Sequence, residues 1–476
     1  SSVSKNSLKC SLLQLQCHFT WNLRREDVDL DDLEETIGDQ IKFFIKFNIT
    51  NYNLLSYVCY LKNMKEKALR SLQKAEEIVQ NNHPDEIARR SLVTWGNYAW
   101  ICFYMERYEE AQSYVSKVEN SYKKLSCTAQ WKIQFPEIYA EKGWAYLKFG
   151  GNYYKEAKNC FENALKDEPN NPEFHAGYAI AIYRSEDYLL GQCEDASLSF
   201  KALKRAVELN PWDTSIVALL ALKFQDLKRD DEGEAYIKEA MQKTPDLPYV
   251  LRYAAKFYRR KGEADKALEI VKKALEVTPN SAILQHQLGL CYRAKLFQLK
   301  KTRYPPQEQV QELIQNSIFH FKIVVEKRPK LFVAYTDLAN MYGEAKRYEE
   351  GEETLQKALQ INNLSDYDKQ QIYYHYGNFH RFHMKSESEA IQFYIEALKI
   401  ANDSYYFHKC RTILKKLLEQ RIQRGSRNAT DFGTLGFIYR LNGEKHEATE
   451  YYKKAIALSP NSEEYLSALC ELQIST

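Results

Sequence analysis

Apolar residues recur at helical spacing along the chain, in pairs of short segments that are separated by a break. The clearest pair lies within residues 245–279. Its first segment runs from about Tyr249 to Lys261 and is followed by Gly262, and its second runs from about Asp265 to Val277 before Pro279. Small and apolar residues occupy the face that the two segments share: Leu251, Ala254, Ala255, Tyr258, Ala267, Val271 and Ala274. The pattern predicts two amphipathic helices packed as a hairpin.

This hairpin repeats along the sequence. Prolines at 211, 245 and 279 are spaced by 34 residues, the period of the tetratricopeptide repeat, in which each two-helix unit buries its apolar face on its neighbours. Prolines at 169 and 329 lie 42 and 50 residues from the nearest member of that series, so we expect insertions after Tyr183-Arg184 and after Tyr292-Arg293. Further units are expected at 52–84, 91–125, 138–170, 331–364, 372–402 and 432–464. The predicted fold class is all-α, a tetratricopeptide-repeat superhelix or solenoid.

The repeats suggest a division of the chain into five segments. We expect a helical N-terminal cap, N-terminal repeats, central repeats, inserted and C-terminal repeats, and a last segment that holds a basic linker helix, the last repeat and a C-terminal cap. Their predicted ranges are 1–50, 51–135, 136–279, 280–402 and 403–476.

Composition, charge and motifs limit the classes of function that the chain can have. The 67 basic and 64 acidic residues leave a net charge of +3, so any site for a polyanion must come from local clustering. The 10 cysteines contain no CxxC pair, which indicates reduced core thiols in a cytoplasmic protein. No apolar run approaches a membrane span, and a signal-peptide core is not evident. We find no phosphate-binding glycine loop, HExxH motif or nucleophile elbow, so we expect neither an enzyme nor a required cofactor.

Basic and aromatic residues share the other face of the first helix in the 245–279 hairpin. These are Tyr249, Arg252, Lys256, Arg259 and Arg260. In tetratricopeptide arrays this face lines the concave side, and the matching slots of other repeats hold Lys148, Arg184, His286 and Gln287. The unit between, TSIVALLALKFQDL, offers mainly apolar or neutral residues. Because Arg and Lys suit phosphates and Tyr suits bases, the pattern favours a basic central RNA-binding channel over a merely solvated charged face.

Several longer strings add a family resemblance. CHFTWNL, SLVTWGNYAW, EKGWAYLKFGG, LRYAAKFYRRK and LGFIYRLNGEK resemble the interferon-induced proteins with tetratricopeptide repeats, most of all the member numbered five. The likeness extends from about Cys17 to Leu472. It implies a cytoplasmic antiviral effector, not an enzyme, that binds single-stranded RNA with a 5′-triphosphate in a narrow basic pocket of a closed superhelix. Family paralogues and other antiviral proteins are the protein partners it suggests, and we expect no binding to duplex DNA or membranes.

The resemblance also assigns residues. It implies contacts with the 5′-triphosphate from Thr36, Gln40, Lys148, Tyr249, Arg252, Arg259 and Gln287. It implies contacts with the first nucleotides from Tyr154, Arg184, Tyr253, Lys256 and His286. Asp32 stands where a Glu near a phosphate-bound metal ion is expected, so a Mg²⁺ ion bridging the triphosphate is the one cofactor that the resemblance suggests.

Some positions depart from the family pattern and keep alternatives open. Ile283 replaces an aromatic beside the early bases, and Phe47 replaces a Lys at the pocket mouth. Thr36 favours a triphosphate because cap-preferring members carry Arg there, whereas Trp144 resembles their cap-stacking Trp. The first alternative is therefore a cap-dependent mRNA binder that blocks translation. The second is a tetratricopeptide scaffold that binds peptides or proteins, although the Asn pattern of a carboxylate clamp is absent from the face described above.

Overall fold

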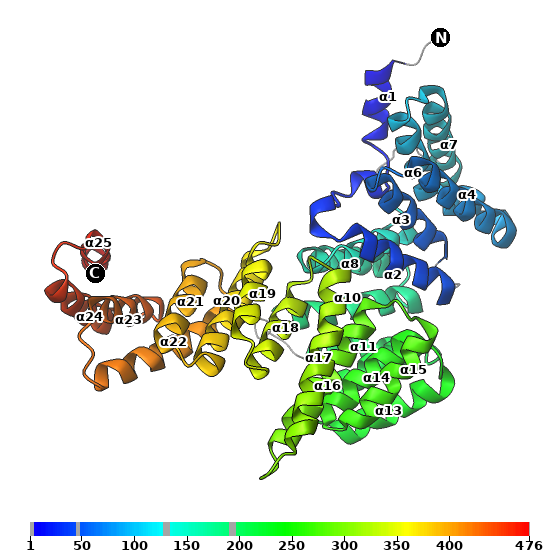
Figure 1. The fold of residues 1–476 in the computed structure, drawn as a ribbon. Helices are drawn as coiled ribbons and strands as arrows, with labels where there is room; N and C mark the ends of the chain where they lie inside the picture. Colours follow the sequence, from blue (N-terminus) through cyan, green and yellow to red (C-terminus); the bar gives the residue numbers. More distant parts are fainter. Residues whose placement is uncertain (1–3, 44–47, 127–133, 190–196, 476) are drawn as a thin grey trace. The chain divides into compact units, whose positions relative to one another are not determined.

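The computed structural model describes residues 4–43, 48–126, 134–189 and 197–475. Within these ranges the regular structure is helical throughout, and it contains no strand. The all-α prediction is confirmed (Figure 1). Phe47 and residues 190–196 of the first predicted insertion lie outside the described residues.

The chain forms two compact units that divide after Gln298, close to the end of one long helix, α16 (Ala282–Lys300). We call them the N-terminal unit and the C-terminal unit and describe each by itself. The predicted segment 280–402 spans both units. The predicted cap at 1–50 ends inside α3, which begins at Asn48.

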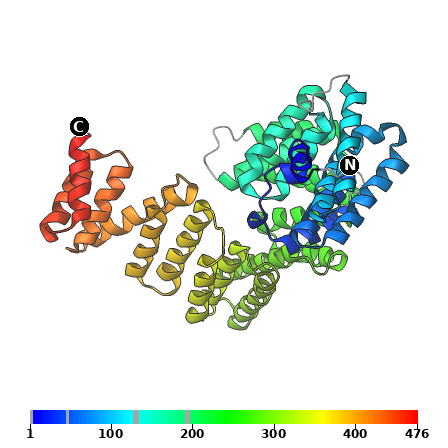
Figure 2. The same ribbon diagram turned by 90° about the horizontal axis from the view of Figure 1, so that it is seen from above.

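The N-terminal unit contains most of α16 and all the helices before it. Successive helices pack in pairs, such as α3 with α4, α8 with α9 and α14 with α15. Figure 2 shows the helices of this unit, coloured blue to green, from above. The helices are α1 Lys5–Leu12, α2 Leu30–Phe43, α3 Asn48–Leu61, α4 Lys65–Asn82, α5 Ile87–Arg90, α6 Leu92–Tyr104, α7 Tyr108–Ser126, α8 Pro136–Lys148, α9 Tyr154–Asp167, α10 Pro172–Leu189, α11 Ser197–Leu209, α12 Thr214–Asp226, α13 Asp230–Lys243, α14 Pro248–Lys261 and α15 Ala264–Val277.

Helix α14 shows how the sequence sets its own limits. Pro248 occupies the first turn, where its missing N–H has no intrahelical partner to lose. Gly262 ends the helix in the left-handed conformation with φ of 97°, and its N–H caps the last carbonyls. The predicted packing residues Leu251 and Tyr258 are fully buried. The two-helix unit predicted at 245–279 is therefore confirmed.

The C-terminal unit continues the same architecture. Its helices are α17 Gln307–Lys327, α18 Phe332–Glu344, α19 Tyr348–Leu359, α20 Asp366–Asn378, a π-helical turn Phe379–His383, α21 Glu387–Lys399, α22 Tyr405–Gln423, α23 Ala429–Leu441, α24 Lys445–Leu458 and α25 Glu463–Ile474. Helices α18 with α19, α20 with α21 and α23 with α24 form the three predicted units. The extra residues of the second insertion lengthen α16 and α17 on either side of Pro305-Pro306, and α22 fills most of the basic segment 403–430.

The described cysteines are free thiols, six of them buried, with Cys10 and Cys470 exposed. Burial raises the pKa of the Cys291 thiol to about 11, which keeps it protonated and unreactive. Among the described helices, none combines the length and apolar composition needed to cross a bilayer.

Candidate functional site

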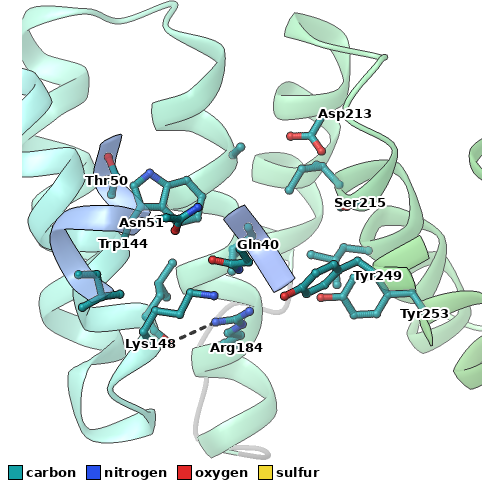
Figure 3. A pocket seen from close by; sticks show the side chains of 16 residues that line it. Gln40, Thr50, Asn51, Trp144, Lys148, Arg184, Asp213, Ser215, Tyr249 and Tyr253 are labelled. Atoms are coloured by element: carbon teal, nitrogen blue, oxygen red, sulfur yellow. Dashed lines mark hydrogen bonds between the residues drawn. The ribbon is translucent and has the colours of Figure 1, made fainter. Parts of the chain in front are cut away.

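The N-terminal unit encloses a cavity of ≈ 110 Å³, which we call the N-terminal cavity. Side chains from α2, α3, α8, α10, α12 and α14 converge on it (Figure 3). The lining residues are Gln40, Thr50, Asn51, Leu54, Trp144, Leu147, Lys148, Ala176, Ile180, Arg184, Asp213, Ser215, Ile216, Leu219, Tyr249 and Tyr253. Helices from distant parts of the sequence therefore build one site.

Helix α8 contributes an aromatic and a cationic side chain from the same face. Trp144 and Lys148 are one turn apart, so both point into the cavity. The indole of Trp144 packs edge-on against Phe161, with ring centroids 5.1 Å apart. Gly143 leaves room for Phe161, because a Cβ at that position would lie 2.8 Å from its ring. The core thus holds the indole in place.

Lys148 is the electrostatic centre of the cavity. Burial, together with the charges of Arg184 and Arg252, lowers the pKa of the Lys148 ammonium to about 7, and Asp32 opposes that shift. Arg184 lines the cavity from α10 and donates a hydrogen bond from Nη1 to the carbonyl oxygen of Leu147 at 3.3 Å. Crowded cations with lost hydration favour an anion between them.

Two tyrosines of α14 form the wall that faces these cations (Figure 3). Burial raises the pKa of Tyr249 to about 12, although Arg252 and a hydrogen bond with Gln40 oppose the shift. Tyr249 therefore keeps its proton at neutral pH and can donate it to an anionic oxygen. The guanidinium of Arg252 lies 5.4 Å from the ring centroid of Tyr253.

The structure gathers part of the predicted site in this cavity. Gln40, Lys148, Arg184, Tyr249 and Tyr253 line it, and Arg252 and Asp32 act electrostatically on Lys148. The other predicted contacts are half-buried and do not line this cavity: Thr36, Tyr154, Lys256, Arg259, His286 and Gln287. Their roles stay predictions.

One sequence-based expectation is wrong. Arg260 does not face the cavity, because it is exposed and pairs with Asp226. One residue beyond Arg259 rotates the side chain by about 100°, which turns it off the shared face. Tyr153 is buried, and its hydroxyl donates to Asp27 Oδ2 at 2.6 Å and accepts from the N–H of Arg24 at 3.0 Å. Its place is structural.

Sequence reasoning missed the opposite end of the cavity. Asn51 is only 5% exposed, and its Nδ2 has no hydrogen-bond partner among the described residues; the same is true of Ser215 Oγ. Asp213 precedes α12 in the capping position, but its side chain does not cap the helix and lines the cavity instead. The predicted apolar wall is present, formed by Ile216 and Leu219 of α12.

Comparison with known proteins identifies relatives over nearly the whole length. The tetratricopeptide repeat family profile matches residues 333–363 and 432–462. The chain is 45% identical to the antiviral innate immune response effector IFIT1 of Homo sapiens over 464 residues, which are 96% of this chain and 97% of the relative. It is 40% identical to interferon-induced protein with tetratricopeptide repeats 2 of Homo sapiens over 458 residues, 94% of this chain and 95% of the relative.

Solved structures agree with these matches. The human IFIT1 dimer with PPP-AAAA superposes with a TM-score of 0.83 at 45% identity, over 95% of this chain and 99% of that one. The human IFIT1 dimer with m7Gppp-AAAA gives a TM-score of 0.85 over the same shares at the same identity. The predicted tetratricopeptide-repeat solenoid is therefore confirmed.

Proposed function

The chain belongs to the interferon-induced proteins with tetratricopeptide repeats, and on that premise we propose that it is an antiviral effector that sequesters single-stranded RNA bearing a 5′-triphosphate. Human IFIT1, 45% identical, has been solved with PPP-AAAA. The proposal includes action in the cytoplasm, by binding and not by catalysis, alone or with family paralogues.

One observation carries the proposal. Lys148 and Arg184 meet at one end of a confined cavity, with Arg252 close enough to depress the pKa of Lys148. A terminal triphosphate concentrates several negative charges in a small volume, and fixed guanidinium groups match its oxygens better than mobile surface charges do. Tyr249 and Gln40 add neutral donors at the same end.

The nucleotides that follow the triphosphate would lie along the neighbouring half-buried side chains. Tyr253 offers an aromatic face within the cavity, and stacking on aromatic rings is tolerant of base identity. The remaining predicted contacts, Thr36, Tyr154, Lys256, Arg259, His286 and Gln287, belong to this proposal.

A bridging Mg²⁺ ion is compatible with the site through Asp32. Among the described residues no cluster of three or more His, Cys, Asp or Glu side chains could hold a metal alone. Mg²⁺ at phosphates commonly takes only one or two carboxylates, with phosphate and water oxygens supplying the rest. Asp32 acts electrostatically on Lys148 and partly offsets the lowering of the Lys148 pKa. The Asp32 carboxylate would therefore be the protein ligand beside a bound triphosphate.

A second candidate ligand is a capped 5′ end, favoured by the far end of the N-terminal cavity. There the Trp144 indole offers a stacking face, and Asn51 Nδ2 and Ser215 Oγ lack partners within the described chain. A base beyond the triphosphate would stack on the indole and satisfy these polar atoms. Human IFIT1 has been solved with m7Gppp-AAAA and, as a monomeric mutant, with Gppp-AAAA.

The test compares one RNA sequence with a 5′-triphosphate, a 5′-cap or a 5′-hydroxyl in titrations with the full chain. We expect the triphosphate strand to bind at least tenfold more tightly than the hydroxyl strand, and Arg184→Ala to remove most of that difference. Equal affinity for triphosphate and hydroxyl ends would refute the proposal. Tighter binding of the capped strand would select the second candidate.

A further inference from the structure

A second cavity, of ≈ 290 Å³, lies wholly within the C-terminal unit, and we call it the C-terminal cavity. It is lined by α18, α19, α20 and the π-helical turn that follows α20. Its lining alternates amide and imidazole side chains with the apolar side chains of Leu355, Phe379 and Phe382. The RNA-binding proposal makes no use of this cavity.

Two asparagines from consecutive repeats face it with their donor ends available. Asn340 Oδ1 accepts from His383 Nε2 at 2.8 Å, and Asn378 Oδ1 accepts from the Tyr394 hydroxyl at 2.6 Å. Burial lowers the pKa of His383, so its ring is neutral, and Nε2 is the donor because its partner, Asn340 Oδ1, can only accept. Both acceptor ends are thus engaged, while neither Nδ2 group hydrogen-bonds to a described residue. The cavity presents two oriented amide donors.

The π-helical turn shapes the mouth of the cavity. The ring of His383 lies directly against α18 at Gly343, where an added Cβ would meet the imidazole at 2.5 Å. The same turn leaves Phe382 53% exposed, with the Arg381 guanidinium 4.8 Å from its ring centroid. An extra residue in a helical turn often marks a functional site, and here it directs an exposed aromatic side chain to the rim.

The charges and ring geometry favour a peptide over a nucleotide. No Lys or Arg side chain is among the residues that line the cavity, and Glu344, which does line it, pairs with Lys300, so the interior offers little to hold a phosphate. The rings of Phe379 and His383 are inclined by 52°, which does not form a flat slot for a base. Amide donors on successive repeats suit the carbonyl oxygens of an extended chain, whose main chain supplies affinity and whose side chains supply specificity.

We propose that the C-terminal cavity binds an extended peptide segment of a protein partner. Asn340 and Asn378 would donate to its main-chain carbonyl oxygens, and one bulky apolar side chain would pack on Phe382 and Leu355. Lys385 is exposed near His383, so an acidic residue beside the apolar one complements the rim. This activity is separate from RNA binding in the N-terminal unit.

The test pans a phage library of random heptapeptides on the full chain. Phe382→Ser removes the exposed anchor, and Asn340→Ala removes one donor. Phe319→Ser is the matched control, because Phe319 is 61% exposed on α17 and does not line the cavity. We expect enriched peptides to carry a large apolar residue next to an acidic one. Their synthetic forms should bind at least tenfold more weakly to Phe382→Ser and Asn340→Ala, and equally to the control.

Melting curves and 5′-triphosphate RNA titrations accompany each variant. Phe382→Ser alters only an exposed side chain, so we expect its affinity for 5′-triphosphate RNA to be unchanged. A loss of peptide binding in this variant is then due neither to the RNA site nor to a folding defect. The inference is overturned if no sequence is enriched, or if the peptides bind Phe382→Ser as well as the parent chain. Displacement of the peptide by a 5′-hydroxyl oligonucleotide would also overturn it, since the cavity would then be a nucleic-acid site.

Discussion

The guanidinium of Arg184 donates to the carbonyl oxygen of Leu147, and this bond fixes its position next to Lys148. Two groups that repel each other are therefore held together by a hydrogen bond from the Arg184 side chain of α10 to the backbone of α8. Burial and, to a smaller extent, this repulsion lower the pKa of the Lys148 ammonium to about 7. A bound ligand with enough negative charge would raise the pKa of Lys148 again.

The pH dependence of RNA binding should report this rise in pKa. A bound triphosphate raises the pKa of Lys148, so above pH 7 the complex takes up a proton that free Lys148 lacks. Affinity should consequently fall from pH 7 to 9, by up to about tenfold per pH unit for one proton. Lys148→Arg, which does not titrate in this range, should bind with a nearly flat profile. Identical slopes in both proteins would show that another group titrates.

The same shift affects folding in a defined direction. Between pH 7 and the ordinary lysine pKa of 10.5, the unfolded chain holds a proton that folded Lys148 lacks, so the contribution of Lys148 to stability rises with pH across this window. Binding and folding thus respond oppositely to pH, which separates loss of affinity from loss of structure.

Arg252 and Tyr258 lie on different faces of α14, so substituting them should affect different properties, RNA binding and stability respectively. Arg252→Ala should weaken binding of 5′-triphosphate RNA by about 2 to 3 kcal/mol, since a charge-assisted contact is lost, with little change in the thermal midpoint. Tyr258 is fully buried, so Tyr258→Ala should destabilise the fold by about 3 to 5 kcal/mol. Paired binding isotherms and melting curves decide the matter. An unstable Arg252→Ala beside a stable Tyr258→Ala would reverse our assignment of the two faces.

The helices and one face of the site could be predicted from the sequence, because both depend on local periodicity. The α14 face was predictable from spacing alone, and Gly262 and Pro248 marked its limits. Arg260 was misplaced because a single residue of rotation separates the cavity face from the exposed one.

The far end of the N-terminal cavity was not predictable in this way. Asn51 and Asp213 come from different repeats, and only the folded chain brings them to the same cavity as Trp144. A capping-type Asp before a helix ordinarily predicts a cap, and nothing local shows that Asp213 faces a cavity instead. The family resemblance identified Trp144 but not Asn51 and Asp213, which line the same cavity.

The half-buried Glu141 gives a stability prediction that is independent of RNA. Burial raises the pKa of its carboxyl to about 7, and Oε1 accepts from Asn53 Nδ2 at 2.8 Å. The folded state keeps a proton that the unfolded state loses between pH 4.5 and 7, so stability falls as pH rises through this window. Glu141→Gln retains the acceptor without the charge and should gain about 2 kcal/mol over the parent chain at pH 8, but little at pH 4.5. Melting curves of both proteins at pH 4.5 and pH 8 test this prediction. An equal gain in stability at the two pH values would contradict it.

We expect Asp213 to contribute to the preference for a methylated cap. N7-methylation gives guanine a positive charge, and the Asp213 carboxylate lines the cavity that contains the Trp144 indole. Asp213→Asn should reduce the preference for m7Gppp-AAAA over Gppp-AAAA roughly fivefold, the scale of a partly solvated ion pair. PPP-AAAA is the control, and its affinity should not decrease. An equal loss for all three strands would mean that Asp213 supports the structure and does not read the base.

The N-terminal cavity should accept an unpaired 5′ end and exclude a base pair. Six helices or their caps contribute to a space of ≈ 110 Å³, and side chains that converge on one triphosphate leave no room for a second strand. RNA duplexes are instead recognised on open surfaces through the minor groove. The test uses one 5′-triphosphate strand annealed to complements that leave zero, two, four or six nucleotides free at the 5′ end. Binding should be absent for the blunt duplex and recover as the overhang lengthens, with the 5′-hydroxyl strand as the control. Tight binding of the blunt duplex would mean that the cations of Lys148 and Arg184 act from an open groove, and the enclosed site would have to be abandoned.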